Sequence, residues 1–228
     1  MKSNIRNFIK ESAQRSRKSL GEYPFGSGYA FVKDPLPDNV NIESVLDTIS
    51  RLIPARLMFA VDTILIGDFE ELKSKNINAM LKDGAIYVSN DQDDEEDMVD
   101  DIIHEIAHSV EEENAYFLYA QDQNLVIEFT NKRKTFQRLL TDIGVDVSGY
   151  DFGEIEYDLE FDQFLFREVG YEVLESLVNG LFPNAYSPTS IREYFASGFE
   201  EYFLGDRNYL KKVSPVLYRK IKEILKDD

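Results

Sequence analysis

The stretch that decides how this chain is interpreted runs from Ile103 to His108 and reads IHEIAH. It holds both histidines of the 228 residues, His104 and His108, four positions apart, with Glu105 directly after the first. Residues i and i+4 of a helix lie on one face, so two imidazoles can offer nitrogen atoms to one metal ion. Glu105 projects about 100° around the helix from His104, within reach of a water on that metal. The HExxH spacing therefore predicts a metal site; the alternative is a histidine pair on a solvated acidic face.

The surrounding residues favour a helix with this motif on its polar side. Apolar residues recur at helical spacing and form one stripe, and the histidines fall opposite it. The members of the stripe are Met98, Val99, Ile102, Ile103, Ile106 and Val110. The acidic run from Asp93 to Asp97 precedes them, and negative charge in a first helical turn is favourable. We interpret this run as the start of the helix rather than as a calcium site.

A third metal ligand must be a carboxylate. The chain has no cysteine and no further histidine, whereas a catalytic zinc takes three protein ligands and keeps one open position. Glu111, Glu112 and Glu113 follow on the same helix and cannot easily complete a tetrahedron above its face. A second amphipathic helix is predicted from Ser190 to Phe203.

The polar side of this second helix carries Glu193, Ser197 and Glu200. Either glutamate could supply the third ligand. Ser190 and Glu193 also match a capping box, in which Glu193 would serve only the helix N-terminus.

At these residues the chain resembles the anthrax lethal factor catalytic domain and the related Pro-Pro endopeptidases. The resemblance rests on HEIAH at 104–108, on EYFASGF at 193–199 and on Tyr186, seven residues before Glu193. The Pro215-led segment that ends the chain is similar to the last helix of that family. The match covers roughly residues 84–226, with low identity outside the motifs.

This resemblance implies a zincin-like metallopeptidase. His104, His108 and Glu193 would bind Zn²⁺, Glu105 would be the general base, and Tyr186 would stabilise the oxyanion. The family helix usually carries an acid four residues after the metal-binding glutamate, where this chain has Ser197. The segment between His108 and Glu193, the 109–185 insertion, is longer than in those relatives.

The remaining sequence predicts an α+β fold with a small N-terminal sheet and a mainly helical C-terminal part. A helix is expected over 41–52, and strands over 63–67 and 85–89, with a turn at 82–84 between them. The strand over 85–89 is expected at the edge of a cleft, where it can hold an extended peptide. The stretch 149–166 is expected to form an added hairpin or a lid.

We expect a basic N-terminal arm over 1–20 and a single zincin-like domain over 21–228. Within that domain, 21–90 would bear the strands and 91–228 the HExxH helix, the insertion and the third-ligand helix. The arm holds six basic residues and one acid, and its role is open between a pro-segment, a docking tail, a membrane-surface helix and a solubilising terminus.

The amino-acid composition limits which classes of partner the chain can bind. A net charge of −18 disfavours nucleic acid and favours a peptide or protein substrate of basic character. No secretory signal and no stretch of membrane-spanning length is evident, which predicts a cytoplasmic protein without stable membrane insertion. Delivery by a dedicated export or injection route stays open as the alternative.

Two functions follow from these observations. The first is a zinc metalloendopeptidase. The second is a catalytically weak or inactive zincin-like module that serves as a structural or interaction protein in a larger assembly.

Overall fold

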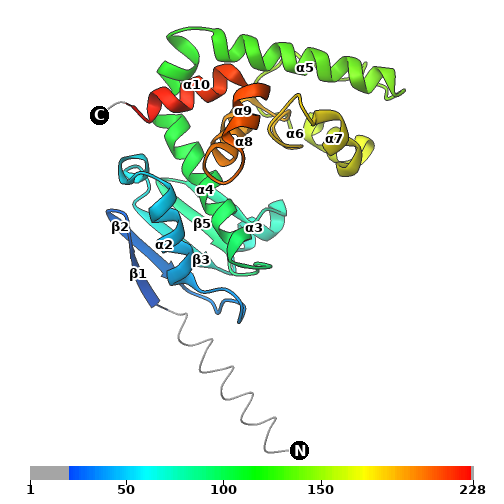
Figure 1. Cartoon of the computed structure of the whole chain (residues 1–228). Coiled ribbons are helices and arrows are strands. Elements are labelled where there is room, and N and C mark those ends of the chain that lie inside the picture. The colour runs from blue at the N-terminus through cyan, green and yellow to red at the C-terminus, as the bar shows by residue number, and fades with distance from the viewer. Residues whose placement is uncertain (1–20, 227–228) are drawn as a thin grey trace, which may run out of the picture. The chain divides into compact units, whose positions relative to one another are not determined.

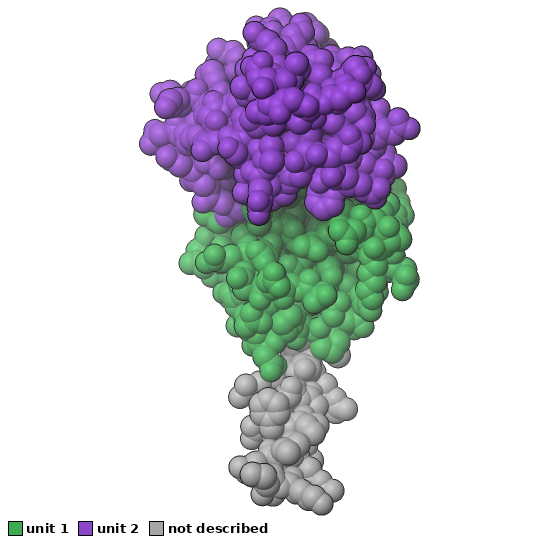
Figure 2. Space-filling model, turned by 90° about the vertical axis from the view of Figure 1, so that its right-hand side faces the viewer, with its two compact units in different colours: residues 1–110 green, residues 111–228 purple. Residues whose placement is uncertain are grey.

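The computed structural model describes residues 21–226, so the basic arm over 1–20 lies outside the described residues. The chain divides between Val110 and Glu111 into two compact units, which are coloured separately in Figure 2. The expectation of a single domain over 21–228 stays a prediction. Within the described part, no helix has both the length and the apolar character needed to cross a membrane.

Unit 1 is built on a five-stranded mixed sheet, which confirms the expected α+β class and the small N-terminal sheet (Figure 1). The strand order is β1-β2-β3-β5-β4. The inner pairs β2–β3 and β3–β5 are parallel, and the outer pairs β1–β2 and β5–β4 are antiparallel. The strands are β1 (Gly21–Phe25), β2 (Gly28–Val32), β3 (Thr63–Gly67), β4 (Ala79–Lys82) and β5 (Ala85–Ser89).

One face of this sheet forms the core of unit 1. Strand side chains alternate between faces, so residues in register on neighbouring strands form rows across the sheet. Ala30, Ile64 and Ile86 make one such row, and Val32, Ile66 and Val88 make the next. All six side chains are buried. The β-branched pattern that predicted strands over 63–67 and 85–89 therefore reflects this shared buried face.

The expected turn is present between β4 and β5. Asp83 and Gly84 both have positive φ angles, 53° and 75°, as a two-residue hairpin turn requires. The strand before this turn, β4, was not foreseen, and it changes the position of β5. Because β5 pairs with β3 on one side and β4 on the other, residues 85–89 offer no open strand edge to an extended peptide, and the expectation that they hold one is wrong. The edge strand there is β4.

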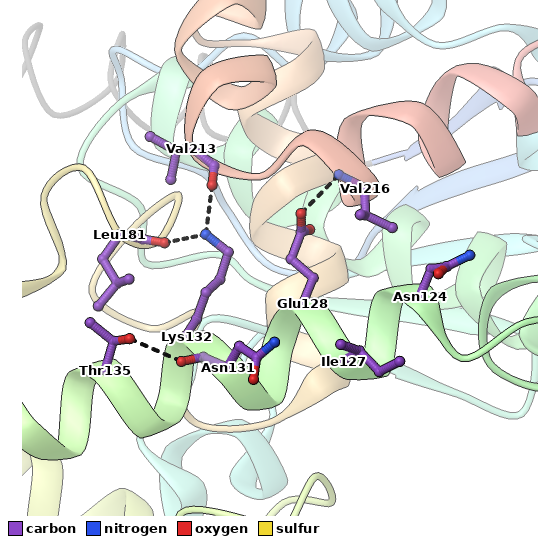
Figure 3. Close-up of a pocket in the computed structure, with 9 residues that line it drawn as sticks. All are labelled: Asn124, Ile127, Glu128, Asn131, Lys132, Thr135, Leu181, Val213 and Val216. Carbon is purple, nitrogen blue, oxygen red and sulfur yellow. Dashed lines mark hydrogen bonds between the residues drawn. The ribbon is translucent and has the colours of Figure 1, made fainter.

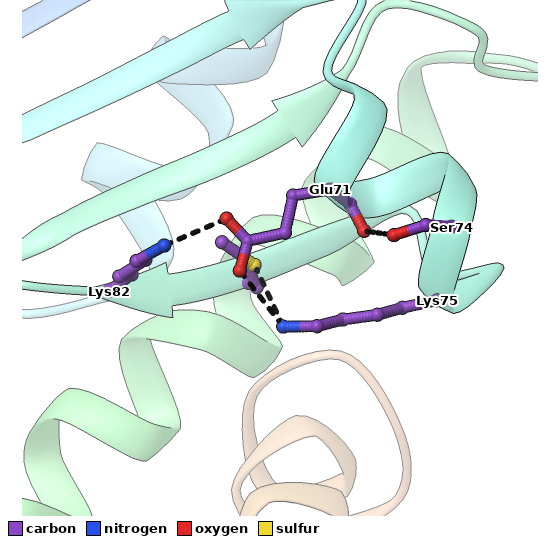
Figure 4. Close-up of polar contacts among 5 residues, drawn as sticks. Glu71, Ser74, Lys75 and Lys82 are labelled. Carbon is purple, nitrogen blue, oxygen red and sulfur yellow. Dashed lines mark hydrogen bonds and ion pairs between the residues drawn. The ribbon is translucent and has the colours of Figure 1, made fainter.

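Ion pairs join β4 to the short helix α3 (Glu70–Lys75) (Figure 4). The Glu71 carboxylate accepts from Lys82 Nζ at 2.8 Å and from Lys75 Nζ at 3.1 Å, and Lys82 is the last residue of β4. These side chains are exposed, so each pair contributes little by itself. Together they connect the edge strand to the helix that precedes it.

The remaining helices of unit 1 follow the predicted periodicity. Helix α2 (Ile42–Leu52) is capped by Asn41 and buries Ile42, Val45, Leu46 and Ile49, as expected for 41–52. A 3₁₀ turn, η1 (Ala55–Met58), follows Pro54. Helix α4 (Glu95–Glu113) carries the HExxH motif and runs past the boundary into unit 2. Asp94 Oδ1 accepts the N–H groups of Glu96 and Asp97, so the acidic run does begin this helix.

Unit 2 is helical throughout its regular elements, which confirms the mainly helical C-terminal part. Its elements are η2 (Tyr116–Ala120), α5 (Asn124–Asp142), α6 (Leu159–Phe164), η3 (Leu165–Val169), α7 (Tyr171–Val178), α8 (Ile191–Phe203), α9 (Arg207–Val213) and α10 (Pro215–Ile224). The hairpin expected within 149–166 is wrong, because residues 159–169 are helical. Pro215 opens α10, where its missing N–H has no intrahelical partner to lose.

Two buried cations of α5 organise unit 2. The Arg133 guanidinium lies 4.1 Å from the Phe161 ring centroid and donates to the carbonyls of Thr189 and Asp151. Lys132 Nζ donates to the carbonyls of Leu181 and Val213 at 2.5 and 2.6 Å. Both side chains come from α5, so this helix holds the segments that lead into α8 and out of α9.

Candidate metal centre

The two histidines of the motif converge on one point above α4. Their Nε2 atoms are 3.1 Å apart, and their ring centroids are 4.8 Å apart with the planes at 80°. A tetrahedral zinc with two imidazole ligands at about 2.0–2.1 Å brings the two nitrogens to roughly 3.3 Å from each other. The pair therefore fits a shared zinc ion with little adjustment.

The apolar stripe of α4 explains why the rings point this way. Its six members are each at most 7% exposed, so this side of the helix is fixed in the core of unit 1. His104 and His108 lie on the other side and are half-buried. The sequence prediction of a buried stripe opposite the motif is confirmed.

Asp101, one turn before His104, is a charged neighbour that the sequence reasoning did not single out. Its Oδ2 accepts from Gln92 Nε2 at 3.0 Å. Burial raises the pKa of Asp101 to about 6, while the Gln92 hydrogen bond and the charge of His104 act in the opposite direction. Its i, i+3 spacing from His104 on a predicted helix is the sequence signal that could have identified it.

Glu105 is buried, with 7% of its surface exposed. Its Oε2 accepts the backbone N–H of Leu81 at 2.6 Å, and Leu81 belongs to the edge strand β4. Unit 1 therefore brings together His104, His108 and Glu105, with the glutamate fixed against the sheet.

In unit 2, Glu193 lies in the first turn of α8 and is half-buried. Ser190 is the N-cap of this helix, since the Glu193 N–H donates to Ser190 Oγ at 3.2 Å, while a capping role of the Glu193 carboxylate stays a prediction. Ser197, one turn later, is 1% exposed, and its Oγ has no hydrogen-bond partner among the described residues. Where the resembled family carries an acid, this chain has a small hydroxyl enclosed in the helix packing.

Arg192 joins the start of α8 to the last turn of α4 within unit 2. Its Nε donates to Glu111 Oε2 at 2.9 Å and its Nη2 to Glu112 Oε1 at 2.8 Å. The Glu111 side chain is 5% exposed, whereas that of Glu112 is 60% exposed. Both of these glutamates are therefore ion-paired to Arg192.

Tyr186 lies in the loop before α8 and is 41% exposed. Asn184 Oδ1 accepts the N–H groups of Tyr186 and Ser187 at 3.1 and 2.9 Å, and the Tyr186 carbonyl accepts from Thr189. This compact turn fixes the backbone that carries the phenol.

A second phenol, Tyr157, lies close enough to Glu193 to respond to its charge. Partial burial, a hydrogen bond to Asp162 at 2.8 Å and the charges of Asp162 and Glu193 raise the pKa of Tyr157. The Ile191 N–H donates to the Ile155 carbonyl at 2.8 Å, which brings this segment beside the start of α8. Sequence reasoning missed Tyr157 because the contact depends on a long-range pairing.

A pocket of about 440 Å³ lies elsewhere in unit 2, along α5 (Figure 3). Its charged groups already have backbone partners. Lys132 donates to two carbonyls, and Glu128 accepts the N–H groups of Val216 and Leu217. The predicted site residues are not among those that line it.

Comparisons of the chain with protein-family models, with curated proteins and with solved structures find no match. The similarity to lethal factor thus rests on the motifs quoted above.

Proposed function

We propose that this chain is a zinc-dependent endopeptidase whose metal is held by His104, His108 and Glu193. The observation that carries the proposal is the convergence of the two Nε2 atoms at 3.1 Å beside a buried glutamate on the same helix. Glu193 is the third ligand that the motif resemblance implies, and with it the donor set is two imidazoles and one carboxylate.

The ion pair of Arg192 supports Glu193 as the third ligand in preference to Glu200. Helix α4 is continuous from His108 to Glu111, three residues further on, and Arg192 binds Glu111. Glu193 directly follows Arg192, whereas Glu200 lies almost two turns along α8. The first turn of α8 is therefore the part tied to the helix of the histidines.

The donor set favours zinc. Two imidazoles and one carboxylate, without thiolates, match a frequent ligand set of hydrolytic zinc sites. When bound, zinc supplies a Lewis acid and lowers the pKa of water to about 7. Three protein ligands leave a fourth position for water or substrate.

The side chains supply the proton transfers. Glu105 takes a proton from the attacking water and passes it to the departing amine. Tyr186 donates a hydrogen bond to the charge that develops on the scissile carbonyl oxygen. Because the chain carries a net charge of −18, extended peptides with basic residues are the favoured substrates.

Metal analysis combined with cleavage of an unbiased peptide library at neutral pH tests the proposal. We expect about one zinc per chain, and we expect Glu105→Gln to keep the zinc and lose cleavage. Glu113→Gln is the matched control, since Glu113 is exposed on the same helix. Cleaved sequences should be enriched in lysine and arginine. A purified chain that never binds zinc contradicts the proposal.

The second function, a zinc-binding module without activity, is favoured by one observation. Ser197 stands enclosed and without a hydrogen-bond partner among residues 21–226, at the position where the resembled family has an acid that can support the ligands. A zinc-loaded chain that cleaves no peptide in the library, yet forms a stable stoichiometric complex with another protein, would establish this function.

A further inference from the structure

The contact between Glu105 and the backbone of Leu81 is short and lies in a buried place. The N–H···Oε2 distance is 2.6 Å, and Glu105 is 7% exposed. Hydrogen bonds from an N–H to a carboxylate are shorter and stronger than those between neutral groups. A buried carboxylate that lost this donor would retain a substantial desolvation cost.

The alternation of β4 explains why the Leu81 N–H is available. The Asn78 carbonyl accepts from Ser89 N–H at 2.7 Å, so the backbone groups of Asn78 face β5. In an antiparallel pair, backbone groups point alternately toward and away from the partner strand. Those of Ala79 and Leu81 therefore point outward from the edge of the sheet.

The donor is also held in place. Strand β4 is paired with β5 along its whole length, and Lys82, the next residue, is tied to α3 through Glu71 at 2.8 Å. Fixing Oε2 sets the plane of the carboxylate, and Oε1 is then the oxygen that takes the proton from water. A general base must lie within about 2.6–3.2 Å of the proton that it removes, so a small error in this plane is costly.

We propose that the backbone N–H of Leu81 is a positioning group for Glu105, so that the edge strand of the sheet sets the orientation of the general base. This inference rests on the proposed function, because Glu105 acts as a general base only if the chain hydrolyses peptides. In this proposal β4 acts through its backbone, and none of its side chains takes part.

Replacement of a single amide by an ester tests this role in the full-length, zinc-loaded chain. Leucic acid at position 81 replaces the N–H with an ester oxygen and weakens the preceding carbonyl as an acceptor, and the α-hydroxy analogue of alanine at position 79, which makes the same two changes, is the control. Both sites have an outward N–H on the same strand, and Leu81 is the one whose N–H donates to Glu105 Oε2. We expect kcat on a library-selected peptide to fall about 10- to 100-fold for the position-81 ester, with zinc content and KM retained. Equal kcat values for the two esters would overturn the proposal.

A second measurement does not depend on activity or on the ester. In the zinc-loaded protein, the Leu81 amide proton should resonate downfield and move upfield in Glu105→Ala, while that of Ala79 stays in place. An unmoved Leu81 resonance refutes the positioning role even in an active enzyme. A wild-type chain that cleaves nothing refutes the proposed function instead, whatever the resonance does.

Discussion

Arg192 Nε donates to Glu111 Oε2 at 2.9 Å. Arg192 directly precedes Glu193, and Glu111 follows His108 by three positions. The Arg192 side chain is 40% exposed, whereas that of Glu111 is 5% exposed. The buried carboxylate therefore has a partner that it cannot replace with bulk water. This pair fixes the first turn of α8 against the last turn of α4.

Removal of this ion pair should weaken metal binding. If Glu193 is the third ligand, Arg192→Gln leaves its helix less well held, and we expect zinc affinity to fall about tenfold. Competition with a chelating dye measures the change. Arg51→Gln is the control, because it breaks an exposed pair with Asp47 in unit 1 and should leave affinity unchanged. Unaltered zinc affinity in Arg192→Gln would argue against Glu193 as a ligand.

The close approach of α8 and α10 at Gly198 should be sensitive to one methyl group. A Cβ at Gly198 would lie 2.2 Å from Leu217 Cδ2, so Gly198→Ala forces a side chain in a packed interface to move. We expect destabilisation of about 1–3 kcal/mol in urea unfolding. In the double mutant with Leu217→Ala the two costs should be less than additive, since the smaller side chain makes room. Strict additivity would show that the clash is relieved in another way.

Glu128 links three helices of unit 2, and removal of one of its hydrogen bonds should lower the free energy of unfolding. Its carboxylate accepts the N–H groups of Val216 and Leu217 at the start of α10, and the Tyr194 hydroxyl at 2.9 Å. Tyr194 is fully buried, so Tyr194→Phe should cost about 1 kcal/mol through the lost hydrogen bond. Denaturant titration measures this, and Tyr116→Phe, at a 75% exposed site, should have no effect. Equal stabilities would mean that the carboxylate is satisfied without Tyr194.

Burial of Lys132 should make stability rise with pH. Burial lowers the pKa of Lys132 from 10.5 to about 8. Between these values the unfolded chain binds the proton and the folded chain releases it, so the stability contributed by this residue increases as pH rises. The destabilisation caused by Lys132→Met should therefore be about 2 kcal/mol larger at pH 9.5 than at pH 7. Unfolding titrations at both pH values check this, with exposed Lys211→Met as control. A pH-independent difference would contradict the burial effect.

The local features of the fold were predictable because they depend on neighbouring residues. The apolar stripe of α4, the caps at Asn41 and Ser190, and the turn at Asp83 and Gly84 all follow from short-range patterns. The histidine pair belongs to the same class, since helical spacing alone brings His104 and His108 together.

What could not be predicted depends on pairing between distant segments. Strand β4 has only four residues and a weak pattern, and its pairing with β5 is what moves residues 85–89 into the sheet interior. The contact of Leu81 with Glu105 and the proximity of Tyr157 to Glu193 arise in the same way. Periodicity carries no information on such contacts.

The position of Glu105 also bears on the solubility of the folded chain. Unpaired N–H groups on an edge strand can template the addition of a strand from another molecule, and sheet proteins commonly block them with charge. On β4 the Leu81 N–H is taken by a buried carboxylate, and Lys82 adds an exposed charge at the strand end. By accepting the Leu81 N–H, Glu105 leaves one donor fewer on the edge strand for a strand of another molecule to pair with, and variants that lack its carboxylate release that donor. Oligomerisation, as well as activity, is a property to follow in them.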